Sequence, residues 1–368
     1  MAIAHRPQKI SLLGLQQSLV HPLLNPEAYS WDELATIVER VGAPKFLQQT
    51  KQHGLAPLWF ERIGQNTPDT PVFQKVLPAL RQERISNIGT SAIRLAHAKQ
   101  VQQNLFASNI PSVIFKGMHL SLAVYPESAL RPSADIDILI PSNLKKQATH
   151  SLLKTGAKFE PTANTIDYQC AFHLEQQEVD LHWHLVRQGR VTAESNQIML
   201  QNPTKIDGLI VPNDTAALFA MLTHPLLSTR PGAQDSKLVR LIDLAFWLRQ
   251  RQPDMGSISG ILERTGTQPV AWLMNEWLKR VTHEELSLPF PARLIPSKRK
   301  QKWLARWLPG ENSRIGYNNG LAVQLGYRTA LHNSIGSALQ ELLALTKCRA
   351  TATRELRHFL CLIANGRD

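Results

Sequence analysis

The stretch RPSADIDILIP, residues 131–141, predicts a short β-strand that ends at a proline. Side chains two positions apart on a strand share a face, so Asp135 and Asp137 project together. The isoleucines between and after them face the other way, into a core. Two carboxylates this close repel each other unless positive charge lies between them. Because oxygen ligands on a rigid strand suit Mg²⁺, the pattern indicates a magnesium site.

A second stretch, EVDLHWHL at residues 178–185, repeats this alternation. Asp180, His182 and His184 share one face, and apolar side chains occupy the other. If this strand lies beside the first, Asp180 becomes a third carboxylate of the same site. Three carboxylates with two Mg²⁺ ions form a centre for phosphoryl transfer. The residues predicted to bind metal and to act in catalysis are therefore Asp135, Asp137 and Asp180.

Other interpretations of these strands stay open. D-x-D pairs also occur on solvated edge strands without binding anything. His182 and His184 form an H-x-H pair that suits zinc or iron, although no cysteine or further close histidine completes such a site. In the magnesium interpretation, we expect His182 to orient Asp180 or to contact the acceptor.

The segment before the first strand supplies residue types that bind phosphate. Lys116 and Gly117 end the short apolar run PSVIFKG, and a glycine there lets a phosphate approach the backbone. Lys116 and Arg131 are cations suited to a triphosphate, and Ser133 can donate a hydrogen bond to a phosphate oxygen. The plainer alternatives are a solvated strand end for Lys116, a turn position for Arg131 and a local cap for Ser133. Their joint occurrence favours phosphate binding.

Hydrophobic periodicity divides the chain into four regions. Residues 1–105 show helical patterns, whereas strands and helices alternate over 106–190, with EQQE (175–178) as a hairpin turn. Helical patterns return over 191–290, and a basic helical tail follows over 291–368. This order predicts an α+β fold in which a small mixed β-sheet is flanked by N- and C-terminal helical regions.

Helix boundaries are predicted from capping residues. Ser30, followed by acidic residues, is expected to cap an N-terminal helix. Ser142 is expected to cap the helix after the first strand, and Gly156 to end it. Asp214 stands near the expected start of a later helix.

Net charge and its distribution indicate polyanionic partners. The 368 residues carry a formal charge of +12, and the stretch 291–368 holds 13 Lys and Arg against 4 Asp and Glu. Within it, SKRKQKWLARW (297–307) interleaves cations with tryptophans, which suits nucleic-acid phosphates and bases or an anionic membrane surface. Without an RNA-binding signature, a solvated or acceptor-docking helix is the favoured interpretation.

Cysteine usage and hydropathy bear on the compartment. Cys170, Cys348 and Cys361 are scattered and odd in number, which fits reduced thiols in a cytoplasmic protein and argues against a disulfide framework. The N-terminus lacks the long apolar segment of a signal peptide. We also find no run of the roughly 20 apolar residues that a transmembrane segment needs.

Taken together, these motifs resemble the polymerase-β-type nucleotidyltransferase superfamily, and more narrowly the bacterial family called uncharacterised nucleotidyltransferases. The likeness extends over about residues 30–280, with GLAPLWFERI (54–63) as a helical lead-in, whereas the tail past residue 290 has no such likeness. The matching residues are Lys116-Gly117, Tyr125-Pro126, Arg131-Pro132, Asp135, Asp137, Asp180-Leu181-His182-Trp183, His224, Arg240 and Asp243.

The resemblance implies a nucleotidyltransferase core at 106–190 and Mg²⁺-dependent transfer of a nucleoside monophosphate from an NTP such as ATP. It implies an acceptor that is a small molecule, a sugar or a peptide, as in biosynthetic clusters. The wider superfamily has Gly-Ser where this chain has Lys116-Gly117, so its serine–phosphate contact does not carry over. The expected nucleotide contacts are Lys116, Gly117, Arg131, Ser133 and His182.

Two rival functions remain from the sequence. One is a toxin-like transferase that modifies tRNA or a protein. The other is a non-catalytic protein that binds nucleic acid, through its basic tail, or another partner on a degenerate transferase core. His224 and Asp243 are expected either to orient the acceptor or, as the favoured alternative, to tie two helices together.

Overall fold

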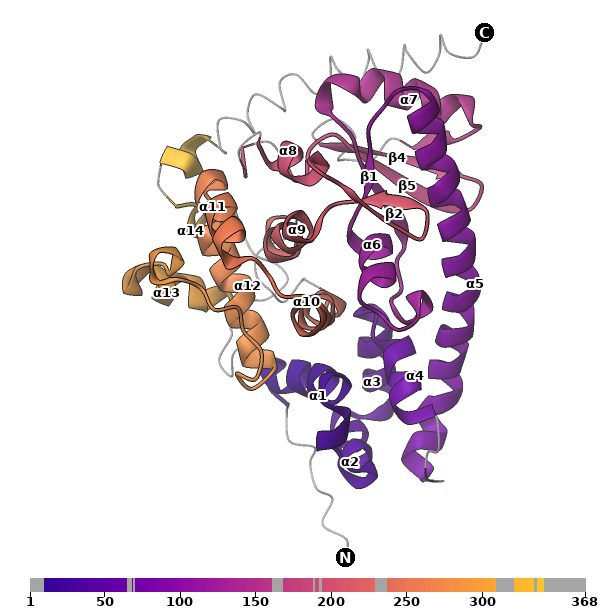
Figure 1. The fold of residues 1–368 in the computed structure, drawn as a ribbon. Helices are drawn as coiled ribbons and strands as arrows, with labels where there is room; N and C mark the ends of the chain where they lie inside the picture. Colours follow the sequence, from indigo (N-terminus) through magenta and orange to yellow (C-terminus); the bar gives the residue numbers. More distant parts are fainter. Residues whose placement is uncertain are drawn as a thin grey trace, which may run out of the picture.

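The computed structural model describes residues 10–64, 68, 70–160, 168–187, 189–191, 194–228, 237–308, 321–333 and 336–340. It confirms the predicted α+β class, with a small mixed sheet among helices (Figure 1). The helices before the sheet are α1 (Leu12–Leu24), α2 (Trp31–Val41), α3 (Ala43–Gln52), α4 (Ala56–Gly64) and α5 (Pro71–Ala107).

Strands and helices alternate in the middle of the chain. The elements of this region are β1 (Val113–Ile114), α6 (Lys116–Ala123), β2 (Asp135–Leu139), α7 (Lys145–Lys154), β3 (Lys158–Glu160), β4 (Gln169–Leu174) and β5 (Gln177–His182). The elements that follow are α8 (Glu194–Leu200), β6 (Thr204–Ile206), β7 (Leu209–Val211), α9 (Asp214–Leu227), α10 (Val239–Gln250), α11 (Met255–Thr265), α12 (Gln268–Val281), α13 (Lys298–Leu304) and α14 (Leu321–Leu331).

The five-stranded sheet has the order β1-β2-β5-β4-β3. Its two central strands, β2 and β5, run parallel, and the other pairs are antiparallel. This arrangement confirms that the two carboxylate-bearing strands are neighbours, and their register sets Asp137 opposite Asp180.

One face of the sheet is packed on α5 and α7. Ile136, Ile138, Val179 and Leu181 are buried in a cluster with apolar side chains of these helices. The alternation that sends these residues into the core sends Asp137, Asp180 and His182 to the opposite face. That face looks toward α9 and α10, which belong to a second, larger apolar cluster.

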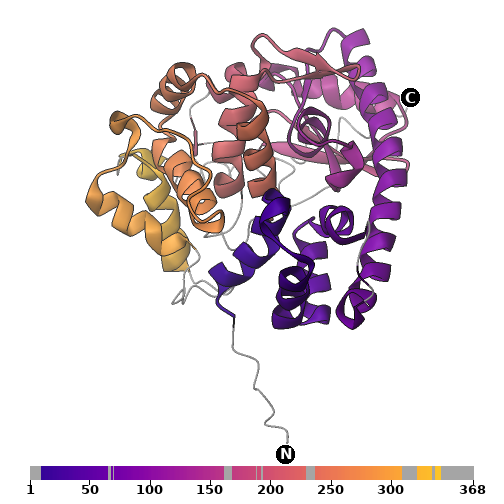
Figure 2. The same ribbon diagram turned by 60° about the horizontal axis from the view of Figure 1, so that its bottom comes forward.

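The 37-residue helix α5 runs along one side of the molecule (Figure 1). Its first half packs against α4 and its second half against the sheet. Helices α11 to α14 lie on the side opposite α5 in both ribbon views (Figure 2).

Several predicted boundaries are confirmed. Ser30 caps α2 in a reciprocal capping box with Glu33. A turn joins β4 to β5, where Glu175 has a φ of 55°. Gly156 follows α7 with a φ of 85°, a left-handed conformation that glycine adopts without strain.

Two local predictions were wrong. Ser142 opens a short 3-10 turn instead of capping α7, whose N-cap position is Leu144. The stretch after residue 190 is not all helical, because β6 and β7 form a hairpin. Its turn, Asp207-Gly208, has φ angles of 47° and 86°, which a two-residue hairpin turn requires.

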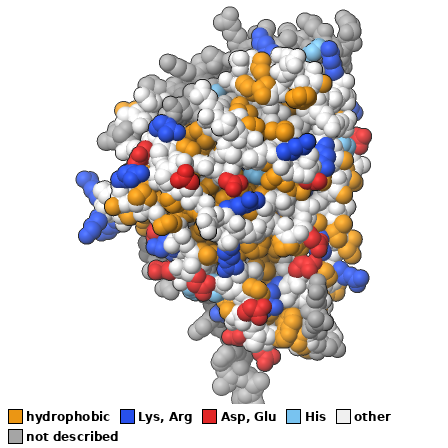
Figure 3. All heavy atoms as spheres, in the orientation of Figure 1, with side chains coloured by type: hydrophobic (Ala, Val, Ile, Leu, Met, Phe, Trp, Pro, Cys, Tyr) orange, Lys and Arg blue, Asp and Glu red, His pale blue; other side chains and the backbone are white. Residues whose placement is uncertain are grey.

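The basic tail is described only in part. Ser297 caps α13, and Lys300 Nζ donates a hydrogen bond of 2.7 Å to the carbonyl of His332. The remainder of the predicted tail, including Cys348 and Cys361, lies outside the described residues. On the face shown in Figure 3, Lys and Arg side chains lie among Asp and Glu side chains. None of the helices described is both long and apolar enough to cross a membrane.

Candidate active site

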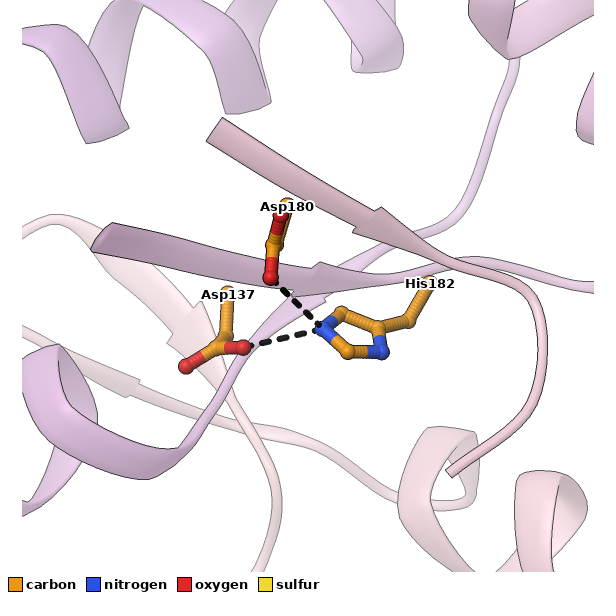
Figure 4. A group of neighbouring side chains, drawn as sticks. All are labelled: Asp137, Asp180 and His182. Atoms are coloured by element: carbon orange, nitrogen blue, oxygen red, sulfur yellow. Dashed lines mark hydrogen bonds and ion pairs between the residues drawn. The ribbon is translucent and has the colours of Figure 1, made fainter. Parts of the chain in front are cut away.

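Three buried side chains converge from the two central strands. Asp137 comes from β2, Asp180 comes from the facing position of β5, and His182 lies two residues further along β5 (Figure 4). One ligand atom from each of the three lies within 4.8 Å of the others, a spacing that one metal ion can bridge. The parallel register therefore assembles the centre that alternation on each strand predicts.

His182 binds Asp137 more closely than Asp180. Its Nε2 lies 2.9 Å from Asp137 Oδ1 and 4.0 Å from Asp180 Oδ2. Burial, reinforced by Lys116 and opposed by Asp137, lowers the pKa of His182 to about 4. The neutral ring can therefore donate its Nε2 proton to Asp137, whereas the sequence led us to expect Asp180 as its partner.

A residue that the sequence analysis missed orients Asp180. Gln169 of β4 stands opposite His182, and its Nε2 donates a hydrogen bond of 2.6 Å to Asp180 Oδ2. A single glutamine on a neighbouring strand belongs to no recognisable sequence motif. Only the pairing of β4 with β5 could have identified it.

Lys116 provides positive charge within the cluster. The residue begins α6 with a φ of 54°, an unusual conformation for a lysine. Its Nζ donates a hydrogen bond of 2.5 Å to Asp137 Oδ1 and lies 3.3 Å from His182 Nε2. The predicted phosphate ligand therefore neutralises a carboxylate in this structure.

The carboxylates carry more negative charge than Lys116 balances. Burial would raise the pKa of Asp137, but Lys116 and His182 outweigh it and lower that pKa to about 2. Burial, reinforced by the charges of Asp137 and Asp135, raises the pKa of Asp180 to about 7. The charge of Asp137, reinforced by burial, raises the pKa of Asp135 to about 6. Hard oxygen donors with excess negative charge fit a divalent cation such as Mg²⁺.

Asp135 stands slightly apart from this cluster. It is half-buried, and the Ser133 hydroxyl donates to its backbone carbonyl at 3.0 Å and lies 3.4 Å from its Oδ1. His182, not Asp135, completes the closest group with Asp137 and Asp180. Asp135 instead lines the adjoining cleft together with Asp137.

The cleft beside the carboxylates has a volume of about 180 Å³. Its floor includes Asp135, Asp137 and Lys116, and its far wall is formed by residues on and beside α9 and α10. Met199 and Met221 add apolar surface to that wall. A cleft with convergent charges on one side and apolar surface on the other suits a small charged group, such as the phosphates of a nucleotide.

Gly117, Arg131 and Ser133 meet at the edge of this cleft. A β-carbon added at Gly117 would lie 2.7 Å from Arg131 Nη1 and closer still to Ser133 Oγ. The glycine is therefore required for this close approach. All three predicted residues line the cleft.

Arg131 is held from behind by Asp243. Its Nε and Nη2 donate to the two carboxylate oxygens of Asp243 at 2.8 and 2.7 Å, and the Tyr125 hydroxyl donates to Asp243 Oδ1 at 2.7 Å. All three side chains are buried. Two of the nitrogens expected to bind phosphate are therefore engaged with a helix of the neighbouring region.

The expected contact between His224 and Asp243 takes a different form. Asp243 ties α10 to Arg131, whereas the His224 ring lies 3.4 Å from Ser228 Oγ on its own helix. The link between α9 and α10 is a 3.2 Å hydrogen bond from Arg240 Nη1 to the carbonyl of Pro225. His184, the other half of the H-x-H pair, lies against Asn196 and outside the group of Asp137, Asp180 and His182.

Comparison with known proteins agrees with this geometry. A family model described as an uncharacterised nucleotidyltransferase matches residues 39–282, about two thirds of the chain. The match spans the sheet, the carboxylate cluster and the helices that face it. No curated protein matches the sequence.

Proposed function

The chain belongs to the uncharacterised nucleotidyltransferase family, and from this premise we propose that it transfers a nucleoside monophosphate from an NTP to a hydroxyl of an acceptor, with release of pyrophosphate. The observation that carries the proposal is the placement of Asp137 opposite Asp180 beside a cleft lined with cations. A small molecule, a sugar or a peptide is the proposed acceptor.

Asp137 and Asp180 are the proposed ligands of Mg²⁺, with Asp135 at the edge of the cleft as the third. Their donor atoms are hard oxygens. The pKa of Asp180 is raised by burial and by the charges of Asp137 and Asp135, and the pKa of Asp135 is raised by the charge of Asp137 and by burial. When bound, Mg²⁺ supplies charge neutralisation at the phosphates and lowers the pKa of a coordinated hydroxyl. Lys116, paired with Asp137, would add positive charge beside the phosphates in this scheme.

Asp180 is the proposed general base. Without Mg²⁺, burial reinforced by Asp137 and Asp135 raises the pKa of Asp180 to about 7. Coordination would lower that pKa, and Asp180 would then accept the proton of a coordinated hydroxyl, whose own pKa the ion also lowers. The acceptor oxygen forms a bond to the α-phosphorus, its proton passes to Asp180, and the bond between the α-phosphorus and the bridging oxygen breaks. Pyrophosphate leaves with the electron pair of that bond.

His182 and Gln169 are positioning residues in this scheme. The neutral His182 ring holds Asp137, and the Gln169 amide holds Asp180. Each carboxylate therefore keeps one oxygen fixed and offers the other, an arrangement that pre-organises the centre before substrates bind.

The test is label transfer in a cell extract. The purified protein is incubated with each α-³²P-labelled NTP and Mg²⁺, and labelled products are separated and identified. We expect one class of product to become labelled in Mg²⁺ and not in EDTA. A labelled tRNA or protein would support the toxin-like alternative, and salt-sensitive nucleic-acid binding without label transfer would support the non-catalytic one.

A further inference from the structure

Two cations face the carboxylates from the opposite wall of the cleft. Lys237 lies directly before α10, and Arg240 lies in its first turn. Both line the same cleft as Asp135 and Asp137. Lys237 is exposed, whereas Arg240 is half-buried. The helical region therefore contributes charge to a site that the strands otherwise define.

The two cations on the side of the cleft that the strands form, Lys116 and Arg131, already form ion pairs. Lys116 binds Asp137, and Arg131 binds Asp243 through two nitrogens. A triphosphate that relied on these residues would have to break short, buried ion pairs. Breaking a buried pair leaves an uncompensated charge, which is energetically costly.

Among the residues that the structure describes, Lys237 and Arg240 form no such ion pair, although Arg240 Nη1 donates a hydrogen bond to the carbonyl of Pro225. Within the described ranges, no carboxylate lies within ion-pair distance of either side chain. Asp243, one turn along from Arg240, is occupied by Arg131 and Tyr125. Burial and the nearby Arg131 lower the pKa of Arg240, against the opposing effect of Asp243, Asp137 and Asp135.

We propose that Lys237 and Arg240 bind the β- and γ-phosphates of the nucleotide, so that α10 supplies the cationic clamp for the triphosphate and the leaving pyrophosphate. This inference rests on the proposed function and specifies which ligand groups α10 recognises. An arginine can bind a phosphate through two parallel hydrogen bonds, and a lysine adds a mobile point charge at the cleft mouth. The nucleotide would thus bridge the carboxylate floor and α10.

The buried contact between Arg131 and Asp243 positions this clamp. It fixes α10 against the segment that carries Gly117 and Ser133, with Tyr125 as a second donor to Asp243. In this arrangement Arg131 acts through α10 more than through direct phosphate contact. Asp243 is accordingly a positioning residue.

The clamp formed by Lys237 and Arg240 can be tested by measuring the binding of a polyphosphate in the absence of turnover. Isothermal calorimetry with inorganic tripolyphosphate in Mg²⁺ would compare the wild type with Lys237→Met, Arg240→Met and the double variant. We expect affinity to fall about tenfold for each single change and about a hundredfold for the double change, since each single variant removes one charged hydrogen bond to a phosphate. The loss for Lys237→Met should shrink at high salt because that side chain is exposed.

Matched variants control this binding test for a general effect of removing surface charge and for unfolding. Lys298→Met removes an exposed cation from α13 and should leave affinity unchanged. Lys237→Met alters a surface position, so it remains informative if Arg240→Met unfolds. The proposal that Lys237 and Arg240 bind the phosphates would be contradicted if the double variant bound tripolyphosphate with the affinity of the wild type. It would also be contradicted if the wild type failed to bind tripolyphosphate. Label transfer in the extract assay is measured separately, so the clamp can fail while the proposed transferase activity stands.

Discussion

Asp137 on β2 lies directly opposite Asp180 on β5, and the two carboxylates differ in pKa by about five units, at about 2 and about 7. Lys116 and His182 both contact Asp137, whereas Gln169, an uncharged amide, holds Asp180. Two chemically identical groups on neighbouring strands are thereby set up for different tasks. In the proposed function, Asp137 stays ionised as a ligand of Mg²⁺ and Asp180 accepts a proton from the acceptor.

Replacing Asp137 with Asn should abolish metal binding at the centre. The substitution keeps the shape of the side chain but removes the charge that holds Lys116 and His182. We expect activity to fall by well over a hundredfold, because even outer-shell changes at metal sites cost about 10–100-fold. Titration with Mn²⁺, followed by electron paramagnetic resonance, would measure the affinity. Asp207→Asn, at the exposed turn of the β6–β7 hairpin, is the control and should bind Mn²⁺ as the wild type does.

Gly117→Ala should impair nucleotide binding without unfolding the protein. The new methyl group would press on Arg131 Nη1 and Ser133 Oγ at the cleft edge. We expect KM for the NTP to rise at least about tenfold, a change of about 1.4 kcal/mol. Gly89→Ala on α5 adds the same methyl group where no atom lies within 4 Å and should change only stability, by about +0.5–1 kcal/mol. Equal KM values in the two variants would contradict this account of Gly117.

Asp243→Asn should destabilise the protein far more than Tyr125→Phe. The first change leaves the buried Arg131 guanidinium without its carboxylate, at a cost of about 3–5 kcal/mol. The second removes one neutral donor and costs about 1 kcal/mol. Urea unfolding midpoints would measure both. Similar midpoints for the two variants would show that the Arg131–Asp243 contact is weaker than its geometry indicates.

Stability should fall as the pH drops below about 6.5, partly because of His119. Burial, reinforced by Arg251, lowers the pKa of this side chain to about 3, so the folded state keeps it neutral while the unfolded state protonates it. The unfolded state binds more protons between about pH 6.5 and 3, which lowers the free energy of unfolding by at most about 1.4 kcal/mol per pH unit. His119→Phe should flatten this slope in urea titrations at pH 7, 6 and 5. An unchanged slope would contradict a buried neutral His119.

The convergence of Asp137, Asp180 and His182 on one face of the sheet could be predicted, because alternation along single strands encodes it. Asp135, Asp137, Asp180 and His182 all project to the expected sides of β2 and β5. Alternation does not encode which neighbouring side chain each of these residues contacts. The geometry across the strands decides that His182 binds Asp137 and that Asp135 stands apart from the closest group.

Contacts between segments that are far apart in the chain could not be predicted from the sequence. Arg131 and Asp243 are 112 residues apart, and nothing local marks them as partners. The error over the β6–β7 hairpin has a different cause. Asp207-Gly208 between short apolar runs is a recognisable turn signal, but each strand has only three residues, too few to show a clear alternation.

The central claim is that the carboxylate cluster is the catalytic centre, and its most direct test is to measure label transfer by the Asp180→Asn variant. The variant, the wild type and Asp207→Asn are incubated with α-³²P-labelled NTP and Mg²⁺ in the same extract, and nucleotide binding is measured in parallel. The account predicts that Asp180→Asn still binds NTP but transfers no label, while Asp207→Asn transfers label at the wild-type rate. Label transfer by Asp180→Asn at the wild-type rate would contradict the assignment of this carboxylate cluster as the catalytic centre.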